Sequence, residues 1–447
     1  MKISKLLGTP LLVGSMLLAA PAFAEGDNFI RRVPTKPDLL TFLLVAIGCY
    51  LIAVVTSQVF VTQVLPKRIS SELGNQARFV GLDGIRGYLA LGVFIHHYVI
   101  FWAYLQLGKW DAPPHNVENE LGRASVAIFF MITAFLFWRR ASTTKDLDLR
   151  KFIISRLFRI YPLFLLIFSL LCLGVAYKSG WAIHEPITTM SRHIASWFCF
   201  NTPAINGYKD TWMVISGVTW TLRYEALFYI SLPFLVAIFL KKNEAWKKIL
   251  ALAIVAFLIW HFEPAKSIAP AFFGGIIAVY WGTDKRRIEL LKGRTGSIIG
   301  IASVACVLFL LFKPFTLIGL ALLTVFFVTI SSGNTFFGLL ETPFSLWLGE
   351  ISYSIYLWHG IILWFAMLNV LPRFKAFHLT TAWFVAGAFC LTPIVVLLSC
   401  ATHLLIEKPF IALGQRIARP KSKQVQTERL RASTSPSRNP AASPQIS

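Results

Sequence analysis

Long apolar runs alternate with short polar segments along almost the whole chain. An apolar run of about 20 residues is long enough to cross the hydrocarbon core of a bilayer as a helix. After residue 25 the sequence contains eleven such runs, which predict an all-α, polytopic membrane protein with about eleven transmembrane helices. The predicted spans are 38–62, 82–106, 122–139, 159–178, 220–240, 247–263, 267–282, 296–312, 314–332, 351–371 and 381–405.

The composition agrees with this interpretation. Of the 447 residues, 56% are hydrophobic and 14% are charged, and the mean hydropathy is +0.64. A soluble domain of this length does not need so much apolar surface, so the composition excludes a soluble globular protein. The six cysteines are scattered without a CxxC pair or a metal-ligand spacing, and we expect neither a disulfide framework nor a bound metal.

The first 24 residues form a separate unit. Lys2 and Lys5 precede an apolar core, and Ala-Phe-Ala stands directly before Glu25. This order is typical of a cleavable secretory signal peptide at 1–24. The alternative is an uncleaved signal anchor, which would add one more helix. Both alternatives leave Glu25 outside the cytoplasm.

Lysines and arginines are distributed unequally between the two predicted faces. With Glu25 outside, the inward loops and the tail carry 27 of these residues, whereas the outward segments carry 10. Positive charge concentrates in cytoplasmic loops, so the C-terminus is predicted to be cytoplasmic. The bias also explains most of the net charge of +22, and we expect no nucleic-acid partner. The segment 413–447 is rich in Arg, Lys, Ser, Pro and Gln and is predicted to be a disordered basic cytoplasmic tail.

The segment LDGIRGYLALGVFIHHY, residues 82–98, places titratable side chains inside an apolar helix. On a helix Arg86 and His97 share nearly the same face, roughly 16 Å apart along the axis. Such groups are expensive in a membrane and are functional candidates by default. Arg86 could hold a phosphate near the cytoplasmic surface, and His97 could take a proton from a hydroxyl near mid-membrane. The alternative is that Arg86 reaches the headgroups while His96 and His97 form interhelical hydrogen bonds.

A second cluster, RLFRIYP at residues 156–162, lies where the fourth span begins. Arg156 and Arg159 are three residues apart and share a helix face. Two guanidiniums on one face suit a polyphosphate or the headgroup of an acyl-CoA. The alternative is that both side chains only anchor the helix at the cytoplasmic surface.

A third cluster, WTLRYEALFY at residues 220–229, places Glu225 in an apolar frame. A buried carboxylate needs a partner or a proton. Glu225 could pair with Arg223 or with another arginine, or it could orient a histidine. The alternative is an ion pair with a purely structural role.

Two further motifs follow. The segment LGEISYSIYLWHG, residues 348–360, brings Tyr353, Tyr356 and His359 into a span, although its aromatic residues could simply form an interfacial belt. The final motif, IEKPF, is interpreted as structural, with Pro409 ending the last helix.

Together and in this order, the motifs resemble the acyltransferase-3 family of integral-membrane acyltransferases. The family pattern begins with LDGLRG and a later histidine, matched here by LDGIRG and His97. It continues with Arg-x-x-Arg-Ile-Tyr-Pro, WSL-x-x-E, SY-x-x-YLWH and EKP, each with a counterpart in this chain. The resemblance predicts a ten-helix membrane acyltransferase domain at 78–412, preceded by an extra helix and loop at 25–77. One departure is Thr133 with Ala134, where the family usually has Ser-Gly, so helix packing is expected to differ there.

The resemblance implies transfer of an acyl group, most often acetyl, from cytoplasmic acetyl-CoA or another acyl-CoA to a sugar hydroxyl. The acceptor would be an envelope or secreted glycan or a lipid-linked saccharide, such as lipopolysaccharide O-antigen or exopolysaccharide, at the bacterial inner membrane. No metal cofactor is expected. By this resemblance the catalytic residues are His97, Arg86 and Glu225, the CoA-binding residues are Arg156, Arg159 and Tyr161, and the acceptor-binding residues are Trp220, Tyr353 and His359.

The residues leave alternatives open. His97 could act as a general base on the acceptor, or it could take the acyl group itself and pass it on. A transporter or flippase of a glycan precursor could use the intramembrane Arg, His and Glu as a proton relay. Transporters tend to show internal repeats, and no such symmetry is found here. A membrane scaffold in a polysaccharide synthase complex is the third alternative, and it predicts that substitution of His97 has no effect.

Overall fold

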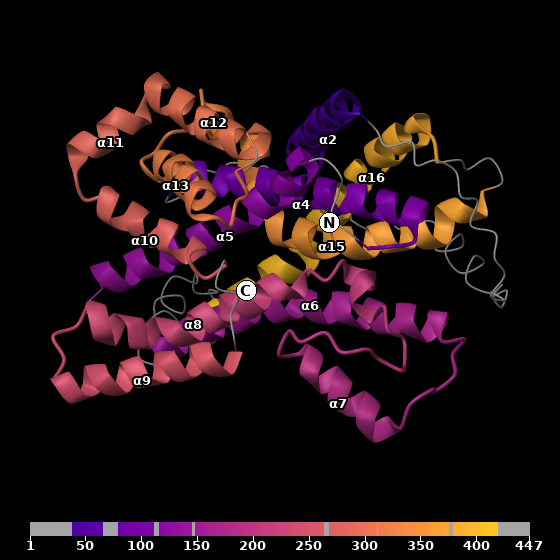
Figure 1. Cartoon of the computed structure of the whole chain (residues 1–447), viewed down its shortest axis with the longest axis horizontal. Helices are drawn as coiled ribbons and strands as arrows, with labels where there is room; N and C mark the ends of the chain where they lie inside the picture. Colours follow the sequence, from indigo (N-terminus) through magenta and orange to yellow (C-terminus); the bar gives the residue numbers. More distant parts are fainter. Residues whose placement is uncertain are drawn as a thin grey trace, which may run out of the picture.

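The computed structural model describes residues 38–65, 79–110, 116–144, 148–262, 268–310, 312–374 and 379–418, and its regular elements are helices (Figure 1). The predicted signal peptide at 1–24 and the tail from residue 419 lie outside these residues. The α-helices are α2 Leu39–Val59, α4 Val80–Leu107, α5 Asn116–Thr143, α6 Leu149–Lys178, α7 Ile187–Trp197, α8 Thr219–Phe239, α9 Ala245–Phe262, α10 Ala271–Trp281, α11 Lys285–Lys292, α12 Arg294–Phe309, α13 Leu317–Ser331, α14 Pro343–Glu350, α15 Ser352–Phe365, α16 Thr381–Thr402 and α17 Lys408–Ile417.

Each of the eleven predicted spans coincides with a helix, but not every one has the length of a full span. Within the described residues, eight helices are long and apolar enough to cross a membrane. The number rises to nine if α11 and α12, which meet at a bend of 75°, form one broken span. The two remaining predicted spans correspond to the shorter apolar helices α10 and α13. The chain is therefore a polytopic all-α membrane protein.

Helix α4 lies in the middle of the molecule and packs against α5, α14 and α15 (Figure 1). The glycines of LDGIRG allow α14 and the short 3-10 helix before it, Leu339–Glu341, to approach α4 closely. A β-carbon on Gly84 would lie 2.0 Å from the carbonyl oxygen of Leu340, and one on Gly87 would lie 2.4 Å from Cβ of Leu348. Small residues let membrane helices pack backbone against backbone. The motif therefore fixes the depth and rotation of the helix that carries Arg86 and His97.

Between the predicted spans 314–332 and 351–371, the sequence predicts a cytoplasmic loop at 333–350, but the second half of this segment is not a loop. Residues 343–350 form α14, and its side chains from Ser345 to Leu348 are buried. Helix α14 covers the amino-terminal half of α4. Burial against α4 gives a physical reason why this segment, unlike the other predicted inward loops, contains no lysine or arginine.

Of the two residues at the departure from the family pattern, Ala134 lies on the face of α5 that packs against α10, whereas Thr133 lines an internal cavity. Ala134 is fully buried, and a β-carbon on Gly275 of α10 would lie 2.9 Å from its Cβ and 2.1 Å from the Met131 carbonyl oxygen. In this chain α10 therefore supplies the glycine at the contact, so that α5 and α10 still approach closely.

Pro409 does not end the last helix, contrary to the sequence prediction. It lies in the first turn of α17, where a proline costs no hydrogen bond because the first backbone N–H groups have no partner within the helix. Glu407, directly before α17, is buried and bonded to Ser354 of α15. Helix α17 reaches Ile417, so the first residues of the predicted tail at 413–447 are helical.

Candidate active site

A cavity of about 270 Å³ lies between α4, α5, α6, α8 and α15. Five of the predicted site residues line it, although they are far apart in the sequence. These residues are Arg86, Arg156, Arg159, Glu225 and Tyr353. Arg86, Arg156 and Tyr353 come from the amino-terminal parts of their helices, and Arg140 comes from the last turn of α5. Antiparallel helices bring such ends to one side of a bundle, so the arginines gather at the predicted cytoplasmic side. Glu225 lines the same cavity, although the sequence predicts it at the outer entrance of its span.

Arginines dominate the polar part of this cavity. Arg86 lies 3.9 Å from the carboxylate of Asp83, one turn earlier on α4. Arg156 packs its guanidinium 4.9 Å from the centre of the Phe137 ring, and its Nε is buried without a partner among the described residues. Arg140 is exposed, whereas Arg159 is half-buried. Four guanidiniums with so little carboxylate to neutralise them suit a ligand that carries several negative charges.

Glu225 is the acidic member of the cavity, and its partner differs from the one predicted first. The hydroxyl of Tyr229 donates to its Oε2 at 3.0 Å, from the next turn of α8. Arg223 is exposed and lies instead over the ring of Phe262, 5.9 Å from its centroid. A charge-assisted hydrogen bond from a tyrosine holds the carboxylate toward the cavity arginines.

His97 does not line the cavity; it forms a pair with His359. Nδ1 of His97 lies 3.1 Å from Nε2 of His359, and the rings stack with centroids 5.0 Å apart. The same Nδ1 lies 3.1 Å from the Val93 carbonyl oxygen. His97 is partly exposed, whereas His359 is fully buried. The neighbouring His96 directs its Nδ1 to the Glu118 carbonyl oxygen at 3.0 Å, while its ring lies edge-on to that of His97 with centroids 5.1 Å apart.

Tyr356 connects the histidine pair with the cavity. Its ring lines the cavity and lies edge-on to His359, with centroids 5.8 Å apart. Its hydroxyl donates to the Val218 carbonyl oxygen at 2.9 Å and lies 2.6 Å from the Thr221 hydroxyl. The tyrosine is thus held from α8 while it covers one side of His359. A group that enters between the arginines would need to pass this ring to reach His97.

Besides His359, two predicted binding residues, Tyr161 and Trp220, lie outside the cavity. Tyr161 donates its hydroxyl to the Phe198 carbonyl oxygen at 2.9 Å. Five residues after Arg156, it points about 140° away on the same helix, so the two side chains cannot share a ligand on one face. Trp220 is 38% exposed and packs against Tyr224 and against Phe130, which itself forms part of the cavity wall. Neither residue therefore lines the cavity.

Sequence reasoning did not assign a role to three residues that the structure places at the site. Arg140 was counted only as a topology signal at the end of the span 122–139. Tyr229 stands four residues after Glu225, and Tyr356 three residues before His359, which are the spacings of neighbours on a helix. These spacings were the available signal, but only the packed structure shows which neighbour faces a cavity.

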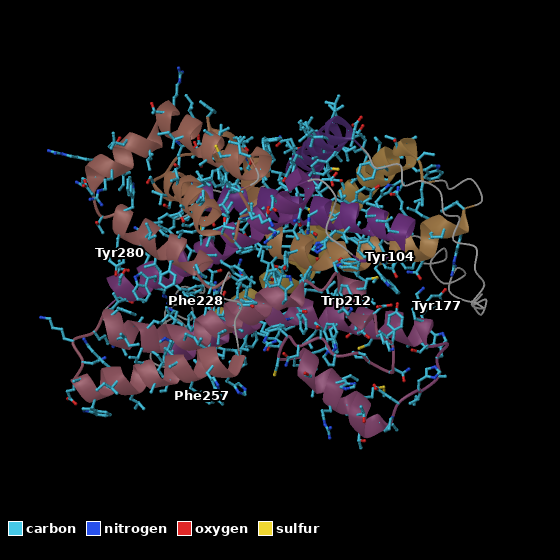
Figure 2. All side chains as sticks on the ribbon, viewed as in Figure 1. Tyr104, Tyr177, Trp212, Phe228, Phe257 and Tyr280 are labelled. Carbon is cyan, nitrogen blue, oxygen red and sulfur yellow. The ribbon has the colours of Figure 1, made fainter. Side chains whose placement is uncertain are left out.

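Aromatic rings surround the side of His97 that faces the carboxy-terminal half of α4. Trp110 lies 6.4 Å from the His97 ring, and it packs against Phe101, Tyr104 and Trp212 with centroids between 5.0 and 6.3 Å apart. Tyr104, Trp110 and Trp212 are all partly exposed. Figure 2 shows Tyr104 and Trp212 in the same region of the molecule, although they come from distant parts of the chain. The surroundings of His97 are thus mainly aromatic, whereas the polar part of the cavity consists mainly of arginines.

The described residues contain no group of three or more His, Cys, Asp or Glu side chains that could hold a metal ion. The arrangement in this part of the chain offers imidazole, guanidinium, carboxylate and phenol groups. These groups can transfer protons and bind anions.

The chain is similar in sequence to several bacterial proteins over about two thirds of its length. The chain is 27% identical over 323 residues to ExoZ, an exopolysaccharide production protein of Rhizobium meliloti, and the match covers 66% of this chain and 91% of ExoZ. It is 26% identical to YrhL, a putative peptidoglycan O-acetyltransferase of Bacillus subtilis, over 62% of this chain and 48% of that protein. It is 24% identical to the O-acetyltransferase OatA of Staphylococcus aureus, over 64% of this chain and 50% of OatA.

The chain thus spans about half the length of the two named O-acetyltransferases. No solved structure matches it. The model of the acyltransferase-3 family, described as an acyltransferase domain, matches residues 79–401, which is most of the chain and contains all nine predicted site residues. The protein therefore belongs to the acyltransferase-3 family of membrane acyltransferases.

Proposed function

We propose that the protein is an O-acetyltransferase that moves an acetyl group from cytoplasmic acetyl-CoA to a hydroxyl of an envelope or secreted glycan. The observation that carries the proposal is the cavity in which α4, α5 and α6 bring four arginines together, one aromatic ring away from the pair of His97 and His359. Membership of an acyltransferase family supplies the reaction class. The names of ExoZ, YrhL and OatA point to extracellular polysaccharide or peptidoglycan as the class of acceptor.

The donor side of the proposal rests on charge. Acetyl-CoA carries several phosphate charges on its nucleotide end and an uncharged pantetheine arm that ends in the thioester. Arg140, Arg156 and Arg159 would hold the phosphates, because guanidiniums form paired hydrogen bonds with phosphate oxygens. The cavity, at about 270 Å³, has room for part of the pantetheine arm but not for the nucleotide, which would remain at the exposed mouth near Arg140.

The chemical step would use His97 as general base. The acceptor hydroxyl attacks the thioester carbonyl while its proton moves to Nε2 of His97. The C–S bond then breaks, and the imidazolium returns the proton to the sulfur, so that CoA leaves as the thiol. The step forms one ester bond and breaks one thioester bond, and it leaves His97 neutral. Arg86 and Glu225 would order the donor cavity on the other side of Tyr356.

The acceptor side rests on the aromatic rings near His97. Faces of pyranose rings carry C–H groups that pack against aromatic rings, and partly exposed Trp110 and Trp212 offer such rings beside the base. A sugar held there would present a hydroxyl to His97 from the side opposite the arginines. The donor and the acceptor would then approach one imidazole from the two faces of the membrane.

The proposal includes the orientation and the organisation predicted from the sequence. The protein would lie in the bacterial inner membrane with its C-terminus in the cytoplasm, so that the arginine cavity opens to the pool of acyl-CoA. The unit 78–412 would carry the reaction, and the preceding segment 25–77 would add one helix. Helix α2 packs on α16 and has no residue in the cavity, which agrees with an accessory role.

The test compares the surface glycan of a deletion strain with that of strains complemented by variants. NMR of the purified glycan should show acetyl esters with the wild-type gene and none with His97→Ala, while immunoblots show equal amounts of protein in the membrane. His96→Ala is the matched control, because this adjacent histidine is directed at the Glu118 carbonyl, and it should retain the esters. Full O-acetylation with His97→Ala, or normal esters in the deletion strain, would contradict the proposal.

A further inference from the structure

We propose that His359 is a positioning residue: through its Nε2 it accepts a hydrogen bond from Nδ1 of His97 and so keeps Nε2 of His97 unprotonated and ready to act as a base. This inference rests on the proposed function and deepens it. The sequence resemblance had placed His359 among the acceptor-binding residues. Its complete burial behind Tyr356 and His97 is incompatible with direct contact with a substrate.

The protonation pattern follows from the three hydrogen-bonding contacts of the pair. Nδ1 of His359 lies 3.2 Å from the Ile355 carbonyl oxygen, which can only accept, so this nitrogen carries the proton. A neutral imidazole has one N–H, and Nε2 of His359 is therefore an acceptor. It faces Nδ1 of His97 at 3.1 Å, so the proton of His97 sits on Nδ1.

The consequence for His97 is a fixed tautomer. Its Nδ1–H is shared between Nε2 of His359 and the Val93 carbonyl oxygen, both at 3.1 Å. Its Nε2 then has the free lone pair that a general base needs. The ring nitrogen that carries the proton is set by the hydrogen bond that the other nitrogen makes. In many hydrolytic sites a carboxylate has this role, whereas here a neutral imidazole takes it, as suits a region of low dielectric constant where a charge would be costly.

The position of His359 is itself held by the packing of α15. Gly360 brings the helix so close to the turn at Thr211–Ile215 that a β-carbon would lie 2.4 Å from the carbonyl carbon of Ile215. One turn earlier, Tyr356 is anchored to the Val218 carbonyl oxygen. These contacts fix the rotation of α15, so the imidazole of His359 is directed at His97 by the backbone.

The experiment measures kcat and KM for acetyl transfer with purified protein, acetyl-CoA and a glycan acceptor that the wild type modifies. His359→Leu removes the ring nitrogen that accepts the hydrogen bond from His97. We therefore expect kcat to fall about 100-fold or more, while KM for acetyl-CoA and KM for the glycan stay within about twofold. His359→Gln places an amide oxygen near the position of Nε2, so its kcat should be at least tenfold higher than that of His359→Leu. Trp358→Phe is the matched control, because this neighbouring side chain bonds to Thr402. This variant should leave kcat and both KM values unchanged.

Two further measurements separate positioning from folding and from substrate binding. In the His97→Ala background, His359→Leu should cause no further loss of residual activity, because a residue that acts through His97 has nothing left to act on. A His359→Leu variant with a wild-type kcat, equal effects of Leu and Gln, or a loss confined to KM for the acceptor would overturn the inference. Failure of the wild type to transfer acetyl at all would instead overturn the proposed function.

Discussion

In its amino-terminal half, helix α4 faces guanidiniums, and in its carboxy-terminal half it faces imidazole and aromatic rings. Arg86 shares a cavity with Arg140, Arg156 and Arg159, whereas His97, three turns later, contacts His359 and Trp110. The same helix therefore passes from a site that suits a highly charged ligand to one that suits an uncharged ring. The difference shows how one membrane helix can present two kinds of chemical group to separate regions of a protein, and under the proposed function these regions would take the two substrates.

The boundary between the two regions is the ring of Tyr356. Charges that lie close to a base alter its readiness to take a proton, and four arginines beside His97 would work against protonation of the imidazole. Under the proposed function, separation by an aromatic ring would leave the arginines to bind the donor and the histidine pair to move the proton. If this division is correct, variants in the two halves of α4 should affect different kinetic constants.

The largest effect is expected at the base. His97→Gln keeps the size of the side chain but removes the ring nitrogen that takes the proton, so kcat should fall roughly 100-fold to 10,000-fold. KM for acetyl-CoA should change little, because the donor is held in the other region. Steady-state kinetics on purified protein in lipid nanodiscs checks this. A large rise in donor KM would show that the two regions are not separate.

The next largest effect is expected at the donor cavity. Arg156→Gln together with Arg159→Gln removes two charge-assisted hydrogen bonds, each of which contributes about 1.5–3 kcal/mol. The dissociation constant of acetyl-CoA, measured by calorimetry, should rise at least about 100-fold. Arg223→Gln is the control, since that exposed arginine lies over Phe262 away from the cavity. An unchanged dissociation constant in the double variant would remove both residues from donor binding.

A smaller effect is expected where α14 sets the position of α4. A β-carbon on Gly349 would lie 1.7 Å from the Asp83 carbonyl oxygen, so Gly349→Ala must push the two helices apart. Overpacking of this kind costs about 1–3 kcal/mol, and the thermal unfolding midpoint in detergent should fall by several degrees. Gly293→Ala is the control, because a β-carbon on that glycine would have no described atom within 4 Å. Equal midpoints for the two variants would show that the close contact is not needed.

The smallest effect is expected on the aromatic side. Trp110→Ala removes one ring beside His97, and an aromatic contact of this kind contributes about 0.5–1.5 kcal/mol. KM for the glycan acceptor should rise roughly twofold to tenfold, with KM for acetyl-CoA unchanged. Trp181→Ala is the control, because this tryptophan is 64% exposed and lies far along the chain from the cluster. A change in KM for acetyl-CoA, with KM for the glycan unchanged, would contradict a role of these rings in acceptor binding.

The sequence predicted the helices well because hydrophobic length and period are local properties. All eleven predicted spans are helical, and the arginines at 86, 156 and 159 were identified from their unusual apolar setting. The length of α10 and α13 was not predictable, because a short helix packed among others can be as apolar as a full span. Helix α14 was missed for a related reason: its burial depends on Gly84 and Gly87, about 260 residues earlier in the chain.

What the sequence determined by itself is the membrane class, the family and the set of chemical groups, since these follow from composition and from motifs within single helices. The tertiary structure decided which of those groups meet. Arg86 and His97 share a face of α4, yet only Arg86 lines the cavity, whereas His97 is paired with His359 behind the ring of Tyr356. The pairing of His97 with His359, 262 positions apart, depends on the rotation of α15, which is set by close backbone contacts that no local pattern encodes.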